Sequence, residues 1–220
     1  MSEFLQAYAD YGVDWLPILL HAALNTVLLS SLGFVLAAVL GMLLALFADA
    51  PYPSLRRAAA LYVTIVRGVP LLAVLFLLYF GLPGIGITFG ALTAAVLGLG
   101  LCFAAQMAEV FRAGLTAIPR GQREAAMAVG FTPPQAFLCI LLPQVVRMII
   151  PPMIVTFVSL IKDSSLASLI TVDELVLAGR AMATEYFLPL QIYIAVGACY
   201  FLIAWPFSFL SKRLDASLRR

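Results

Sequence analysis

Residues 120–143 read RGQREAAMAVGFTPPQAFLCILLP, a polar stretch set between strongly apolar segments. Its first part is good helix-forming sequence, and Gly130 stands where a left-handed residue would end that helix. Thr132, Pro133 and Gln135 then supply an N-cap, a proline at the first helical position and the glutamine of a capping box. The stretch therefore predicts two short helices joined at a bend, a shape that can dock into a groove on a partner. The plainer alternative is a solvated loop without a partner.

The composition excludes a water-soluble domain. Hydrophobic residues make up 64% of the chain, charged residues 11%, and the mean hydropathy is +1.07, which is more apolar surface than a compact chain of 220 residues can bury. Because a helix needs about 20 apolar residues to cross the hydrocarbon, we count membrane spans by segments of that length. Five are predicted, at residues 16–48, 58–80, 89–111, 143–162 and 188–210. The expected fold class is an all-α integral membrane protein with five transmembrane helices, in a single domain over residues 1–220.

The lysine and arginine residues predict the orientation, because such residues accumulate on the cytoplasmic side of a membrane. With five spans, one side receives Arg56, Arg57, Arg112, Arg120, Arg123, Arg147, Lys212, Arg213, Arg219 and Arg220. Only Lys162 and Arg180 remain on the outer half. We therefore expect the N-terminus outside, with the C-terminus and the loop at about 113–142 in the cytoplasm. These loops account for the formal net charge of +2, so it does not call for a nucleic-acid partner.

The remaining polar segments are assigned to the outer side. Residues 1–15 carry no lysine or arginine, so they predict a short amphipathic lead rather than a cleavable signal peptide. Residues 81–86 hold Pro83 between glycines and predict a tight turn. Residues 171–184 are polar on one side and apolar on the other, which predicts a helix lying on the membrane or dipping into it.

Several kinds of chemistry are missing from the sequence. It holds no Gly-x-x-x-x-Gly-Lys-Ser/Thr loop, so we expect no cofactor in this chain, and ATP binding would fall to a partner. Only one histidine is present, at His21, and the three cysteines are far apart in apolar segments, so neither a metal site nor a disulfide is expected. A membrane hydrolase built on Ser164 or Ser165 with Lys162 is a formal alternative, although no strained glycine-flanked nucleophile turn accompanies these residues.

Three stretches, in order along the chain, resemble the permease subunits of polar amino-acid ABC importers, the histidine/glutamine permease family. Residues 66–72 read VRGVPLL, with Val69 where that family usually has threonine. Residues 108–126 read AEVFRAGLTAIPRGQREAA and lead into the spacing of Glu-Ala-Ala, Gly130 and Ile-Leu-Leu-Pro, which is similar to the Glu-Ala-Ala loop of these subunits. Residues 162–166, KDSSL, resemble the outer element that follows the fourth span.

This resemblance implies the type I importer fold, in the inner membrane of a bacterium. It also implies a pathway formed by two permease subunits, identical or paired with a sister protein, that is driven by two cytoplasmic ATPases holding ATP and Mg and is supplied with an amino acid by an outer solute-binding protein. The residues expected to couple to the ATPase are Arg120, Glu124, Ala125, Ala126, Gly130 and Phe131. Two other functions stay open: an ABC permease for a different small solute, and a stand-alone membrane channel or enzyme.

Two polar stripes predict where the substrate passes, since polar groups inside a bilayer normally face a bundle interior. One stripe has Cys102, Gln106 and Glu109 at helical spacing in the third span, and the other lies in the fourth span. The candidate substrate-binding residues are Cys102, Gln106, Thr156, Ser159, Lys162 and Asp163. Alternatively, the hydroxyls of the fourth span bond back to carbonyls of their own helix.

The charged residues near these stripes leave further alternatives. Arg67 and Glu109, expected near the cytoplasmic ends of the second and third spans, are assigned a gating or structural role. Lys162 and Asp163 can receive the two charges of a zwitterion, or can neutralise each other at the end of a helix. Because Thr156 is neutral where the resembled importers of cationic amino acids often have glutamate, we expect a neutral or acidic amino acid as substrate.

Overall fold

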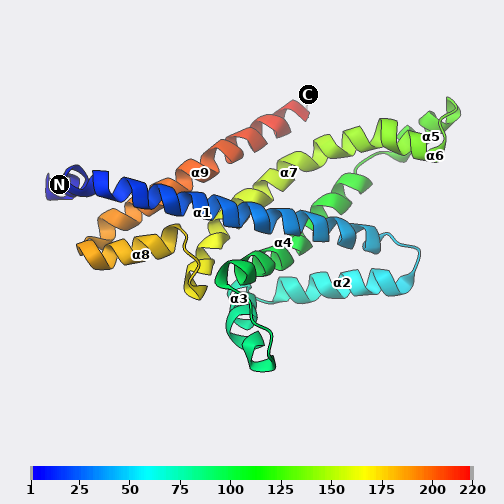
Figure 1. Ribbon diagram of the computed structural model, residues 1–220. Coiled ribbons are helices and arrows are strands. Elements are labelled where there is room, and N and C mark those ends of the chain that lie inside the picture. Colours follow the sequence, from blue (N-terminus) through cyan, green and yellow to red (C-terminus); the bar gives the residue numbers. More distant parts are fainter. Residues whose placement is uncertain (1, 219–220) are drawn as a thin grey trace.

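The computed structural model describes residues 2–218, apart from the side chains of Ser2, Glu3, Leu5 and Arg120, and within this range it contains helices and no strand (Figure 1). The α-helices are α1 (Ser2–Ala48), α2 (Pro53–Gly68), α3 (Leu71–Phe76), α4 (Ala91–Thr116), α5 (Arg120–Ala128), α6 (Pro133–Ala136), α7 (Leu142–Asp163), α8 (Leu175–Tyr186) and α9 (Pro189–Leu218). The π-helical and 3-10 segments between them are η1 (Leu77–Gly81), η2 (Leu82–Ile85), η3 (Phe137–Leu141) and η4 (Ser164–Ile170).

The described residues contain four straight candidate spans, and a fifth if one bent pair of helices is counted as a single span. Four helical segments are long and apolar enough to cross a membrane, namely Gln6–Ala48, Ala91–Thr116, Pro133–Ile170 and Pro189–Leu218. The fifth consists of Pro53–Gly68 and Leu71–Ile85, which meet at an angle of 100°. Residues 58–80, predicted as the second span, are therefore divided between two helices. Pro70 explains the break, because proline pushes the preceding residue out of the helical region, and Val69 is extended at φ −105° and ψ 130°.

The long helix α1 runs across the molecule and packs against α4 (Figure 1). Small residues let the two backbones approach closely. A Cβ added at Gly41 would lie 2.5 Å from the Cβ of Met107, and one added at Gly100 would lie 2.4 Å from the Cδ2 of Leu36. Residues 2–15 of the expected amphipathic lead are part of this helix, with no break between them and the span, and residue 1 lies outside the described residues. The main apolar core lies where the C-terminal part of α1 meets α3, α4 and α7.

A second, smaller core joins the N-terminal part of α1 to α8 and α9. Trp15, Leu175 and Ile192 are its largest buried side chains. The helix predicted over residues 171–184 is present as α8, and it packs so closely on α9 that a Cβ at Gly179 would lie 2.6 Å from Val196. Its placement on the membrane surface stays a prediction. Glu174, just before the first residue of α8, has no exposed surface.

Candidate functional site

The segment α5–α6 folds as the two short helices predicted from its sequence. Helix α5 ends in a glycine cap: Gly130 has φ +93°, its N–H donates to the carbonyl of Met127 at 3.1 Å, and the N–H of Phe131 donates to Ala126 at 3.1 Å. This hydrogen-bond pair is the Schellman motif, which requires a left-handed residue at the position of the glycine. At the start of α6, the backbone N–H of Thr132 donates to the Oε1 of Gln135 at 3.0 Å, as expected for a capping box.

This coupling unit, residues 120–136, lies at the far end of the molecule from the N-terminus (Figure 1). Glu124 and Ala125 are exposed, Phe131 is 38% exposed, and Ala126 is buried beneath them. The side chain of Arg120, the remaining predicted coupling residue, lies outside the described part of the structure. One side-chain hydrogen bond anchors the unit to the span that follows, with the Nε2 of Gln144 donating to the Oε1 of Gln122 at 3.0 Å. The unit therefore offers an exposed, bent surface while remaining attached to α7.

A pocket of about 260 Å³ lies where the bend after α2 meets α4 and the end of α7. Its polar lining comes from four residues, Arg67, Cys102, Gln106 and Asp163. Its apolar walls are Val66, Val69, Leu71 and Phe103. The pocket depends on the bend at Pro70, since the change of direction there places both Arg67 and Leu71 on its wall.

The pocket brings together three of the six predicted substrate residues, Cys102, Gln106 and Asp163. Thr156 is buried outside the pocket lining, and its hydroxyl donates to the carbonyl of Pro152 in the preceding turn at 3.0 Å. The Thr156 hydroxyl therefore bonds back to a carbonyl of its own helix, which was the alternative to a role in the substrate pocket. Ser159 is half-buried and Lys162 is exposed, and neither lines the pocket. Contact of these three residues with substrate stays a prediction.

Arg67 lies in the last turn of α2, beside the bend and in the pocket wall. Its expected position near the cytoplasmic end of the second span, and its gating or structural role, stay predictions. Within the described residues Arg67 forms no salt bridge, and the same is true of Asp163. The pocket therefore contains one fixed positive and one fixed negative side chain that do not pair with each other. The signal that was missed is Pro70, which predicts a helix boundary immediately after Arg67.

Glu109 lies elsewhere, although it shares a helix face with Gln106. It accepts a hydrogen bond from Arg112 one turn later on α4, with 2.9 Å between Oε2 and Nη2. Both side chains are about half exposed, so the pair contributes little to stability. A structural ion pair, one of the two roles assigned to Glu109, agrees with this geometry.

The serines beside Lys162 do not form a nucleophile with it. The Ser164 hydroxyl donates to the carbonyl of Ile161 at 2.8 Å, and the Ser165 hydroxyl donates to the carbonyl of Lys162 at 2.7 Å. Both hydroxyls thus donate to backbone carbonyls at the end of the helix and not to a general base. The geometry gives no support to the hydrolase alternative.

Comparison with known proteins identifies the chain. Residues 37–220 match the family "Binding-protein-dependent transport system inner membrane component". The chain belongs to this family. It is 35% identical over 214 residues to the "Probable amino-acid permease protein YxeN" of Bacillus subtilis strain 168, covering 96% of each protein. It is also 31% identical over 218 residues to the "Probable glutamine ABC transporter permease protein GlnP" of the same organism, covering 97% of this chain and 98% of that protein.

Solved structures of ABC transporters share the fold of this permease. The chain superposes on one described as "Crystal structure of an amino acid ABC transporter with histidines" with a TM-score of 0.86 and 29% identity, covering 93% of this chain and 96% of the other. A second match, to an inward-facing MetNI methionine ABC transporter, has a TM-score of 0.74 at 21% identity and so supports the fold alone. The chain is accordingly a membrane-spanning permease subunit with the type I importer fold.

Proposed function

We propose that this permease carries a neutral polar α-amino acid, and that the pocket between Arg67 and Asp163 is the place where it binds. The observation that carries this proposal is the presence of one cationic and one anionic side chain on the same 260 Å³ pocket, on different helices and unpaired within the described structure. An α-amino acid has one carboxylate and one ammonium group. The two fixed charges of the pocket are complementary to that pair.

Each lining residue has a role in this proposal. The guanidinium of Arg67 donates two parallel hydrogen bonds to the substrate carboxylate, a geometry for which arginine is well suited. The carboxylate of Asp163 accepts from the ammonium group. The amide of Gln106, which both donates and accepts, hydrogen-bonds the polar side chain of the substrate. Since the fixed charges are then used by the backbone of the amino acid, a charged substrate side chain has no partner and its burial is costly.

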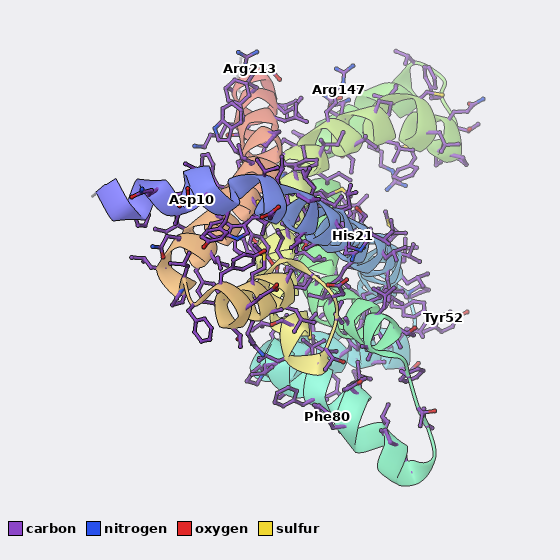
Figure 2. All side chains as sticks on the ribbon, turned by 60° about the vertical axis from the view of Figure 1, so that its left-hand side comes forward. Asp10, His21, Tyr52, Phe80, Arg147 and Arg213 are labelled. Atoms are coloured by element: carbon purple, nitrogen blue, oxygen red, sulfur yellow. The ribbon has the colours of Figure 1, made fainter. Side chains whose placement is uncertain are left out.

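The coupling unit docks, in this proposal, into a groove on a cytoplasmic ATPase that holds ATP and Mg. A second permease subunit completes the pathway, and a solute-binding protein delivers the amino acid from outside the cell. ATP-driven closure of the ATPases moves the coupling units and switches the pathway between inward-open and outward-open states. Figure 2 supports a cytoplasmic C-terminus in the inner membrane, because the labelled Arg147 and Arg213 lie together at the opposite end of the molecule from Phe80.

The test is uptake of labelled amino acids by the permease reconstituted with its ATPase and solute-binding protein. Asp163→Asn and Arg67→Gln should each raise the concentration for half-maximal uptake about tenfold, because each removes one charged hydrogen-bond partner of the substrate. Lys162→Gln, adjacent to Asp163 but outside the pocket lining, should leave that concentration unchanged. If Lys162→Gln is as harmful as Asp163→Asn while Arg67→Gln is harmless, the adjacent Lys162–Asp163 pair binds the zwitterion instead. ATP-dependent uptake of a different class of small solute, with no uptake of any amino acid, would overturn the proposal.

A further inference from the structure

A second pocket, of about 370 Å³, lies between α1, α2 and α4, beside the short loop that joins α1 to α2. Most of its wall is apolar and made of small side chains, including Ala45, Ala60 and Val63. Its polar groups are Arg56, Arg112, Glu109 and the hydroxyl of Thr64. It is separate from the Arg67–Asp163 pocket, with which it shares no lining residue.

The two arginines of this pocket differ in whether they are paired with a carboxylate. Arg112 is held by Glu109 at 2.9 Å, and the carboxylate of Asp49 also acts on it. Arg56 makes one long hydrogen bond, 3.4 Å from Nη1 to the carbonyl of Ala50, and its side chain is exposed. Within the described residues, Arg56 therefore has no salt bridge to a carboxylate. The side chains that line the pocket carry one more positive than negative charge.

The position of the pocket matches a membrane boundary. Arg56 lies in the first turn of α2, immediately after the chain leaves α1, and Tyr52 before it is 65% exposed. Tyrosine is enriched at membrane–water interfaces. The apolar wall of the pocket is formed by residues of α1, α2 and α4, and α1 and α4 are both long and apolar enough to cross a membrane.

We propose that this pocket binds one anionic phospholipid, with its phosphate on Arg56 and an acyl chain along the alanine-rich wall. Anionic lipids are enriched in the cytoplasmic leaflet, and basic pockets between transmembrane helices on that side are suited to their headgroups. Arginine binds phosphate through several donors at once. A free phosphate ion would gain only the contact with Arg56 and would leave the apolar wall without an occupant. A zwitterionic lipid would place its own cation beside the unneutralised Arg56.

Native mass spectrometry of the full-length permease in detergent tests this proposal, with phosphatidylglycerol or phosphatidylcholine added at equal concentration. We expect a retained phosphatidylglycerol molecule at a collision energy that removes phosphatidylcholine. Arg56→Gln should lower the retained fraction about tenfold through loss of the charged contact. The matched control is Arg57→Gln, which removes an equal charge from the neighbouring exposed residue outside the pocket lining, and it should retain the lipid.

A second variant tests the apolar wall without changing charge. Ala60→Leu narrows the pocket from an exposed position and should also reduce phosphatidylglycerol retention, while leaving the melting temperature in detergent unchanged. Equal retention of the two lipids, or an equal loss in Arg56→Gln and Arg57→Gln, would overturn the proposal. A retained inorganic phosphate that blocks phosphatidylglycerol would also contradict it, by showing that the pocket is an anion site without lipid specificity.

Discussion

Tyr200 on α9 donates a hydrogen bond to the Oε2 of Glu174, at 2.5 Å, and the carboxylate of Glu174 has no exposed surface. The other oxygen of Glu174 caps α8 by accepting from the N–H groups of Val176 and Leu177, at 2.8 and 2.9 Å. Thr26 on α1 accepts from the N–H of Leu175 at 3.2 Å. This polar joint connects α1, α8 and α9 at the boundary between the two apolar cores.

The joint predicts a pH dependence of stability. Burial raises the pKa of Glu174 above its usual value, while the hydrogen bonds from Tyr200 and the α8 backbone act in the opposite direction and Asp173 adds to the increase. A carboxyl group whose pKa is raised in the folded state contributes its full stability below the pKa of the unfolded chain, and that contribution is lost as the pH rises through the raised value. Glu174→Gln keeps a cap acceptor without an ionisable proton, so this part of the pH dependence should disappear.

Melting temperatures in detergent between acidic and neutral pH provide the measurement. Glu185→Gln, an exposed position on α8, is the matched control and should keep the slope of the native protein. Glu174→Ala should lower stability by about 2 kcal/mol at acidic pH, because the partly buried Tyr200 hydroxyl and the α8 N–H groups lose their acceptor, and by less as the pH rises. An unchanged slope in Glu174→Gln would show that burial of Glu174 does not control the pH response.

Gly130 supplies a prediction about coupling. Its φ of +93° is unfavourable for any residue with a Cβ, so Gly130→Val should distort the bend at a cost of about 1–3 kcal/mol while leaving the spans inserted. We expect ATP hydrolysis by the assembled complex to lose its stimulation by loaded solute-binding protein. Gly121→Val is the control, since Gly121 lies within α5 and, like Gly130, has open space around a Cβ position. Normal coupled transport by Gly130→Val at normal expression would refute the role of this unit.

The close approach of α1 and α4 predicts a stability effect. Gly41→Ala would place a Cβ 2.5 Å from Met107 and 2.9 Å from the backbone nitrogen of Ala108, which forces the helices apart. We expect a loss of about 1–3 kcal/mol, measured as a lower melting temperature in detergent. Gly197→Ala on α9, where nothing lies within 4 Å of the added Cβ, should not lower it.

The orientation of the chain is open to a direct measurement. Positive-inside counting with five crossings places the N-terminus outside and the C-terminus in the cytoplasm. Single cysteines at Ser2 and Arg220, in a background without the native cysteines, should react with a membrane-impermeant reagent from opposite sides. Labelling of both ends from one side would require an even number of crossings and would overturn this arrangement.

The parts of the structure that were predictable from sequence are those with local causes. The caps at Gly130 and Thr132 depend on residues within one helical turn, so their residue types were sufficient to predict them. The pairing of Cys102 and Gln106 with Asp163 was also anticipated, because helical spacing places polar groups on common faces.

The parts that could not be predicted depend on contacts between distant segments. Arg67 lies in the pocket wall beside a 100° bend between Pro53–Gly68 and Leu71–Ile85. Pro70 predicts a break there but not its angle, and both sides of the bend contact α4. The burial of Glu174 has no local signal in the sequence, because it depends on the packing of α8 on α9, which brings Tyr200 to this carboxylate. The hydroxyl of Thr156 had two possible partners, and only the structure shows that it bonds to Pro152.

The central claim is a charge-balanced pocket for a neutral amino acid, and competition for uptake tests it most directly. Labelled glutamine is offered to the reconstituted complex together with an excess of unlabelled glutamine, arginine or glutamate. The account predicts strong inhibition by glutamine and weak inhibition by the two charged amino acids, because Arg67 and Asp163 are both used by the carboxylate and ammonium groups of the substrate. Strong inhibition by arginine alone would contradict it, since the pocket would then have to supply a second unpaired carboxylate.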